Sequence, residues 1–403
     1  MAKRILFVDD EPMVLSGLQR SLRLMRSEWE MVFAPGGNEA LTAMDLQPFD
    51  IIVTDMRMPG MDGAQLLEEV KKRSPQTLRM VLSGQSDRET ILRSVNPAHQ
   101  FISKPCEAEE LKSRLIRAFA LKDLLQNPGL RELVTKLDNL PSLPHVYLQL
   151  NQELRRPEPE LQKIDELIGA DMAMTAKVLK LVNSAFFCLP CEISRASHAV
   201  KLLGLDTLRA LVLTAHVFEQ FESDVLNADD VQQISDHSLA VSHSARKIAV
   251  FEHADQRTQD ESFTAGLLHD AGKLILASTL GEEYGKVLEY AAKADVGVFA
   301  AEREVLGCSH GQIAAYLFGV WGLPGTIVEA VAWHHEPALS LSVKFSPLAA
   351  VHVASTYHDE KSISRLRDRT PIDAAFLAGI GCAEREKVWR GKLDAMINDG
   401  EAS

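Results

Sequence analysis

Acidic, hydroxyl and amino side chains stand at the ends of short apolar runs in the first quarter of the sequence. Asp9 and Asp10 follow the first run, Asp55 the third, Ser83 the fourth and Lys104 the fifth. If these runs are parallel strands, their carboxyl ends meet at one edge of a sheet, and the five side chains share a crevice. Three clustered carboxylates repel one another unless a cation is present, and hard oxygen ligands suit Mg²⁺. A carboxylate beside Mg²⁺ can attack a phosphoryl group, because the metal and a lysine neutralise charge on the transferring oxygens.

A second set of residues in the later part of the chain has metal-ligand chemistry. In order along the sequence it consists of His237, His269, Asp270, His310, His334 and His335. Adjacent His269 and Asp270 end an apolar helical pattern, and both can turn toward one metal ion. Imidazole and carboxylate ligands would then activate a water molecule for attack on phosphate. Two alternatives stay open: a buried, hydrogen-bonded cluster without metal, and a bound transition metal without turnover.

The elements that must position the acidic set alternate between strand and helix. Apolar runs predict buried strands at residues 5–8, 31–34, 51–54, 80–82 and 99–102. Helical patterns lie between and after them, at residues 12–25, 37–46, 63–73, 86–95 and 107–126. Strict alternation predicts an α/β doubly wound, five-stranded parallel sheet with helices on both faces.

After about residue 130 the pattern changes to amphipathic helices, without strands. Helices are expected at residues 161–169, 172–183, 195–203, 206–221, 227–251, 258–277, 281–294, 297–305, 309–320 and 324–334, with two or three more within 342–399. This predicts an all-α domain. Asn127-Pro128-Gly129 is the best helix breaker near the boundary. We expect an α/β domain at 1–122, a helical connector at 107–135, an all-α output domain at 136–340 and a helical extension at 341–403.

The composition is that of a soluble globular protein. Of 403 residues, 46% are apolar and 25% are charged. Residues 1–125 hold 17 basic and 18 acidic side chains, and the later residues hold 26 and 38. An acidic later region repels a phosphate backbone, so nucleic acid is disfavoured as a partner. No apolar run is long enough for a membrane span, the first residues do not resemble a signal peptide, and five cysteines do not suggest a disulfide framework, so we expect a cytoplasmic protein.

The first domain resembles the receiver domain of bacterial two-component response regulators. The resemblance rests on four motifs at the family's spacing: Val8–Pro12, Asp55–Gly63, Ser83-Gly84 and Lys104-Pro105. It implies that Asp55 accepts a phosphoryl group from a sensor histidine kinase or a phosphotransfer protein. Asp9, Asp10 and the backbone carbonyl of Arg57 would join Asp55 in holding Mg²⁺. Lys104 would contact the phosphoryl group, and Ser83 and Phe101 would move with it as switch residues.

The histidine series resembles the HD phosphohydrolase superfamily, but with departures. No Gly-Tyr-Pro motif follows His334-His335, and Ala354-Ser355 stand where the hydrolase branch places a terminal metal Asp, so we expect the metal set to lack one carboxylate. Five other segments resemble the HDOD domain, a relative generally regarded as non-catalytic: Leu140–Pro144, Ala170–Thr175, Leu181–Phe187, Ala199–Gly204 and Trp321–Pro324.

Together the two resemblances imply a response regulator in a phosphorelay. Phosphorylation of Asp55 would bias an HDOD output that acts through contacts with a protein partner, with a homodimer as an open alternative. In this interpretation the receiver catalyses only its own phosphotransfer. The alternative function is a phosphorylation-gated, metal-dependent phosphohydrolase of cyclic di-GMP or another nucleotide, using the degenerate HD site.

Overall fold

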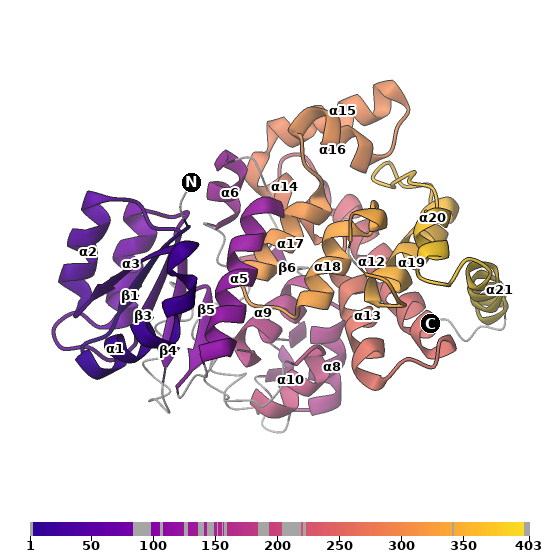
Figure 1. Ribbon diagram of the computed structural model, residues 1–403. Coiled ribbons are helices and arrows are strands. Elements are labelled where there is room, and N and C mark those ends of the chain that lie inside the picture. The colour runs from indigo at the N-terminus through magenta and orange to yellow at the C-terminus, as the bar shows by residue number, and fades with distance from the viewer. Residues whose placement is uncertain are drawn as a thin grey trace. The chain divides into compact units, whose positions relative to one another are not determined.

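A computed structural model describes residues 3–83, 98–104, 108–124, 128–135, 141–142, 149–150, 152–154, 156, 159–183, 193–203, 219–220, 223–340 and 342–398. The chain separates into two compact units that divide near residue 138 (Figure 1). Of the described helices, none is both long and apolar enough to cross a bilayer.

The first unit contains a five-stranded parallel sheet in the order β2-β1-β3-β4-β5. Its strands are β1 (Lys3–Val8), β2 (Trp29–Ala34), β3 (Ile51–Asp55), β4 (Leu78–Ser83) and β5 (Gln100–Ser103). The apolar runs in the sequence coincide with these strands because strands buried on both faces need apolar side chains on both. The predicted doubly wound α/β fold is therefore confirmed.

Helices cover both faces of this sheet. They are α1 (Pro12–Ser21), α2 (Gly37–Leu46), α3 (Gly63–Arg73) and α5 (Ala108–Leu124). Leu6 and Ile52 pack in one apolar cluster with residues of α2 and α3. On the opposite face, Trp29 of β2 lies 5.8 Å from Phe119 of α5, measured between ring centroids. The helix predicted at 86–95 lies outside the described residues.

Two predicted boundaries in the first unit need adjustment. The helix expected over 12–25 ends at Ser21, and a separate 3₁₀ helix, η1 (Arg23–Ser27), follows it. The connector expected over 107–135 consists of α5 and a second helix, α6 (Pro128–Thr135), with 125–127 outside the description. Proline is tolerated in the first turn of a helix, where its missing N–H has no partner to lose, and this allows α6 to begin at Pro128.

The second unit is mostly helical, as predicted. Its helices are α8 (Leu161–Gly169), α9 (Met172–Val182), α10 (Ala196–Leu203), α12 (Ala228–Phe251), α13 (Gln256–Leu268), α14 (Ala271–Leu280), α15 (Glu282–Ala294), α16 (Val298–Leu306), α17 (His310–Val320), α18 (Gly325–Trp333), η3 (Pro337–Leu339), α19 (Pro347–Lys361), α20 (Ala374–Gly379) and α21 (Arg385–Asn398). A two-residue parallel ladder joins β6 (Pro141–Ser142) to β7 (Glu219–Gln220), so the expectation of no strands after residue 130 is wrong at this point. Most of the helix expected at 206–221 lies outside the described residues.

The single helix predicted over 258–277 is wrong. The structure has α13 ending at Leu268 and α14 beginning at Ala271, so the break falls on His269-Asp270. Apolar residues continue through both helices, and this hid the break from a periodicity argument. Because the helix is interrupted at this point, the adjacent side chains of His269 and Asp270 can both face the same side.

Candidate functional site

The first candidate site lies where β1, β3 and β5 end. Asp9 follows β1, Asp55 is the last residue of β3, and Lys104 follows β5. The Lys104 Nζ atom donates a hydrogen bond to Asp9 Oδ2 at 2.8 Å and another to Asp55 Oδ1. These three side chains therefore meet, although 95 residues separate Asp9 from Lys104. Asp10 comes next after Asp9 and is half-buried.

Backbone groups orient the two carboxylates. The N–H of Arg57 donates to Asp55 Oδ2 at 2.7 Å, and the N–H of Glu11 donates to Asp9 Oδ1 at 2.9 Å. A Cβ atom at Gly63 would overlap the carbonyl oxygen of Asp55, so only glycine lets α3 start this close to the end of β3. Each carboxylate thus accepts a hydrogen bond from a backbone N–H at one oxygen and from Lys104 at the other.

The electrostatics of this pocket favour a charged lysine. Burial of Lys104 opposes its ammonium form, but the hydrogen bonds to Asp55 and Asp9 outweigh burial and raise the pKa of Lys104. Asp9 is almost completely buried, with 2% of its side chain exposed, and Asp55 keeps 13%. The more exposed Asp55 is therefore the one that an incoming group can reach.

The donor set at this pocket fits Mg²⁺. Carboxylates of Asp9 and Asp55 already converge on one cation, and the Asp10 carboxylate and the Arg57 carbonyl are further oxygen donors next to them in sequence. Magnesium prefers such oxygen ligands and keeps several waters. The switch side chains predicted at Ser83 and Phe101 lie outside the described part of the structure, although their backbones belong to β4 and β5.

The second candidate site surrounds the break between α13 and α14. Asp270 Oδ1 lies 3.2 Å from His310 Nε2 and 3.5 Å from His269 Nε2. The other oxygen, Oδ2, lies 4.0 Å from His237 Nε2. Four of the predicted residues, His237, His269, Asp270 and His310, therefore do lie together. Glycine again makes the approach possible, because a Cβ at Gly272 would overlap the carbonyl oxygen of His310.

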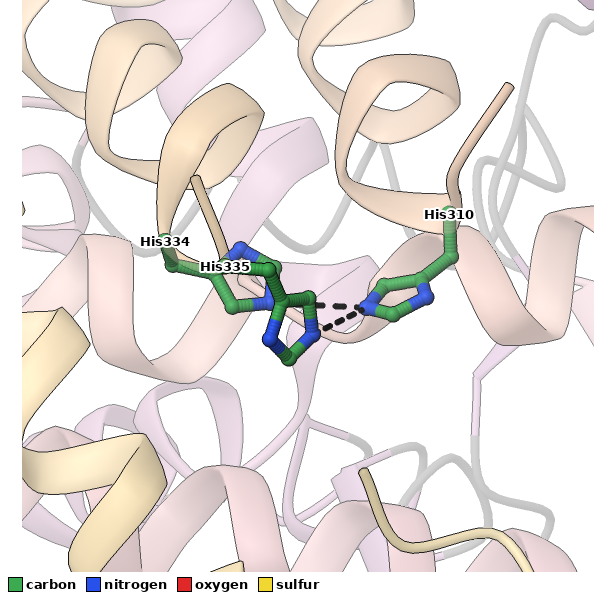
Figure 2. Close-up of side chains that lie close together, drawn as sticks. All are labelled: His310, His334 and His335. Carbon is green, nitrogen blue, oxygen red and sulfur yellow. Dashed lines mark hydrogen bonds between the residues drawn. The ribbon is translucent and has the colours of Figure 1, made fainter. Parts of the chain in front are cut away.

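Three histidines form one side of this cluster. Figure 2 shows the ring of His310, the first residue of α17, facing those of His334 and His335, which follow α18. His310 Nε2 lies 3.4 Å from His334 Nε2 and 3.3 Å from His335 Nε2. Nitrogen ligands about 2.1 Å from a tetrahedral zinc ion would stand about 3.4 Å apart, so these separations suit a common metal ion.

Hydrogen bonds fix how these rings carry their protons. The Nδ1–H of His334 donates to the Val331 carbonyl at 2.9 Å, and that of His269 donates to the Gly266 carbonyl at 2.7 Å. Burial lowers the pKa of His269 to about 3, so its Nε2 carries a lone pair. Among the described residues this Nε2 has no hydrogen-bond partner, as is expected of a metal ligand in the absence of its metal.

His310 differs from the other histidines of the cluster because it donates hydrogen bonds to the buried carboxylate of Glu302. Glu302 Oε2 accepts from both the backbone N–H and the Nδ1–H of His310, each at 2.7 Å, and Glu302 Oε1 accepts from the Tyr284 hydroxyl at 3.0 Å. Burial opposes protonation of His310, but the Glu302 charge outweighs burial and raises the pKa of His310 to about 10. His310 would have to release its second proton before binding a metal ion.

Further carboxylates lie in this cluster. Ser355 of α19 stands at the position of the expected metal Asp, but Asp368, in the segment after α19, places Oδ2 at 3.3 Å from His335 Nε2. Asp359 places Oδ1 at 3.8 Å from His237 Nε2. Sequence reasoning missed Asp368 because a residue outside a helix has no periodic pattern.

A pocket of about 850 Å³ opens beside the cluster. His237, Asp270 and Asp359 of the cluster line it, together with Lys273 of α14. The pocket is large enough for a small-molecule ligand. His237 is the most exposed of the histidines considered, with 17% of its side chain accessible.

Comparisons with known proteins agree with this architecture. A model of the response regulator receiver domain matches residues 5–116, and a model of the HDOD domain matches residues 140–337. An uncharacterized protein from Treponema pallidum is 27% identical over 204 residues, which are 51% of this chain and 39% of the relative. The hydrogenase transcriptional regulatory protein HoxA from Cupriavidus necator is 37% identical over 109 residues, which are 27% of this chain and 22% of HoxA. The chain thus spans well under half the length of either relative.

Two solved structures also resemble the chain. The MmoQ response regulator from Methylococcus capsulatus is 22% identical, covers 62% of this chain and 91% of its own, and gives a TM-score of 0.46. An HDOD domain protein from Geobacter sulfurreducens is 24% identical, covers 72% of this chain and 96% of its own, and gives a TM-score of 0.41.

The parallel sheet and the acidic side chains at its carboxyl edge are those of a receiver domain. The chain joins this receiver domain to an HDOD domain, an architecture that supports a response regulator signalling protein.

Proposed function

We propose that the chain receives a phosphoryl group on Asp55 and that this modification biases an HDOD output acting through protein–protein contacts. The observation that carries the proposal is the shared contact of Asp9 and Asp55 with Lys104. This arrangement gathers a nucleophile, an acidic neighbour and a cation at the carboxyl edge of the sheet. The donor would be a sensor histidine kinase or phosphotransfer protein, and the setting the cytoplasm.

In the proposed phosphotransfer, one carboxylate oxygen of Asp55 attacks phosphorus. The new O–P bond forms as the P–N bond to a phosphohistidine breaks, and the imidazole nitrogen keeps the electron pair. Mg²⁺, held by Asp9, Asp10, Asp55 and the Arg57 carbonyl, would neutralise charge on the phosphoryl oxygens. Lys104 already lies against Asp55 and would exchange part of that contact for a phosphoryl oxygen.

Phosphorylation adds negative charge and strong acceptor oxygens at the end of β3. Ser83 at the end of β4 and Phe101 in β5 are the proposed switch residues that respond. The result is a shift between two conformations of the receiver, and the HDOD domain, its protein partner or a second copy of the chain would sense this shift.

Labelling tests the acceptor. Full-length protein incubated with Mg²⁺ and a small phosphodonor should gain one acid-labile phosphoryl group, detected as intact mass. Asp55→Asn should gain none, whereas Asp45→Asn, which changes an exposed carboxylate on α2, should label like wild type. Equal labelling of Asp55→Asn and wild type would remove Asp55 as the acceptor.

A second candidate function is a metal-dependent phosphohydrolase in the HDOD domain. The observation in its favour is the buried cluster of His237, His269, Asp270 and His310 beside a pocket of about 850 Å³. Incubation of metal-loaded protein with cyclic di-GMP, with His269→Ala as control, tests it. Hydrolysis that disappears in His269→Ala would support this function over a purely protein-binding output.

A further inference from the structure

One lysine lies inside the histidine and aspartate cluster. Lys273 lies in the first turn of α14, three residues after Asp270, which caps the start of that helix. Its side chain is 2% exposed. A lysine is almost never buried this far unless partners compensate its charge, so its surroundings should explain it.

The Lys273 ammonium uses all three of its donors. It donates to Asp270 Oδ2 at 2.8 Å, to Asp368 Oδ2 at 2.8 Å and to the carbonyl oxygen of Leu366 at 3.1 Å. An ammonium group has three N–H bonds and no acceptor, so it is saturated here. Lys273 therefore has no donor left for a ligand.

The two carboxylates that Lys273 joins are themselves buried. Asp270 is 3% exposed and Asp368 is 1% exposed. Two buried carboxylates repel each other unless a cation lies between them. The lysine thus places a positive charge between the two oxygens that a divalent ion would otherwise bridge.

We propose that Lys273 is a resident internal cation that replaces a metal ion between Asp270 and Asp368, so that no transition-metal ion bridges these two carboxylates. Asp270 Oδ2 is already committed to Lys273, and only Oδ1, which faces His269 and His310, remains for a metal ion. An ion bound there would have imidazole ligands, a set that suits zinc, iron or nickel.

The position of Lys273 bears on the second candidate function and does not depend on phosphorylation of Asp55. A two-metal hydrolase needs a close pair of ions to clamp the attacking and leaving oxygens. With Lys273 between Asp270 and Asp368, these carboxylates hold no such pair, and the centre would serve as a structural or ligand-sensing site, or as a one-metal site.

Metal counting tests the proposal. Metal-free full-length chains of wild type, Lys273→Met and the control Lys286→Met, which changes an exposed lysine on α15, are dialysed against zinc and analysed by elemental analysis. Any zinc bound by the receiver is common to all three. Lys273→Met should hold one zinc ion more than wild type, and Lys286→Met should match wild type. Equal zinc in Lys273→Met and wild type would overturn the proposal.

Amine acetylation of the wild-type chain gives a test that needs no variant. With or without zinc, Lys273 should react at least about tenfold more slowly than Lys286, because a buried, hydrogen-bonded group reacts only when the structure opens locally. Acetylation of Lys273 at the rate of Lys286, or a zinc-induced rise in its reactivity, would show that the ammonium does not hold this position.

Discussion

Gly272 packs directly against the backbone of His310, and a Cβ atom at residue 272 would overlap the His310 carbonyl oxygen. This contact joins the first turn of α14 to the first residue of α17 and so brings Asp270 to His310. Because a backbone carbonyl cannot move aside easily, we expect Gly272→Ala to lower the free energy of unfolding by about 1–3 kcal/mol, the usual range for overpacking. Urea unfolding of the full chain measures the change.

Gly285→Ala is the matched control. Gly285 lies within α15, and a Cβ there would meet only the Val225 side chain, at 3.9 Å, an ordinary van der Waals contact. Alanine forms helix better than glycine, so the free energy of unfolding should stay the same or rise by up to about 1 kcal/mol. Similar losses in both variants would argue against the close contact at Gly272.

The pairing of Asp230 with Arg365 predicts a pH dependence. Arg365 Nε donates to Asp230 Oδ1 at 2.9 Å, and Nη2 donates to Oδ2 at 2.5 Å. The hydrogen bonds from Arg365 outweigh burial and lower the pKa of Asp230. A carboxyl whose pKa is lowered by folding adds stability above its unfolded pKa of about 3.9, and this stability is lost as pH falls through the folded pKa.

We therefore expect Arg365→Gln to lower the thermal midpoint at pH 7 and to have progressively less effect below pH 4. The loss at pH 7 should not exceed about 1 kcal/mol, because the Arg365 side chain is 56% exposed and solvent screens its charge. Scanning calorimetry of wild type and variant across this pH range measures the difference. A difference that stays constant with pH would indicate lost packing, and not a lost ion pair.

Removal of the receiver lysine should make the fold depend on magnesium. In Lys104→Met the carboxylates of Asp9 and Asp55 lose their shared cation and repel each other. We expect a lower thermal midpoint than wild type in EDTA and a larger rise on adding Mg²⁺. Differential scanning fluorimetry with and without Mg²⁺ measures both. A midpoint that does not respond to Mg²⁺ in either protein would count against a magnesium site here.

Much of the receiver site could be predicted from the sequence because its functional side chains stand at the carboxyl ends of its strands. Apolar runs locate β1 and β3, and Asp9 and Asp55 are placed by the ends of those strands. Only one further rule, that parallel strands end at a common edge, was needed to bring Lys104 to them. The exact end of α1 was not predictable, because the residues after Ser21 continue a helical pattern.

The cluster of histidines and carboxylates in the HDOD domain was predictable only in part. Its histidines stand out because several imidazoles recur in order in or next to the predicted helices. Glu302 and Asp368 carry no such signal: the first is one of many glutamates on helices, and the second lies in a segment after α19. Their roles depend on burial and on particular neighbours. Glu302 forms a 2.7 Å bond with His310, eight residues further along the chain, and Asp368 forms a 2.8 Å bond with Lys273, 95 residues earlier.

Hydrogen exchange followed by mass spectrometry tests most directly whether phosphorylation of Asp55 reaches the HDOD domain. Wild type treated with phosphodonor and Mg²⁺ should show altered exchange in peptides from residues 140–337 relative to untreated protein, and treated Asp55→Asn should show no change. If wild type is fully phosphorylated and exchange changes only in peptides from residues 5–116, then phosphorylation does not bias the HDOD domain of the isolated chain, and the proposed coupling is contradicted.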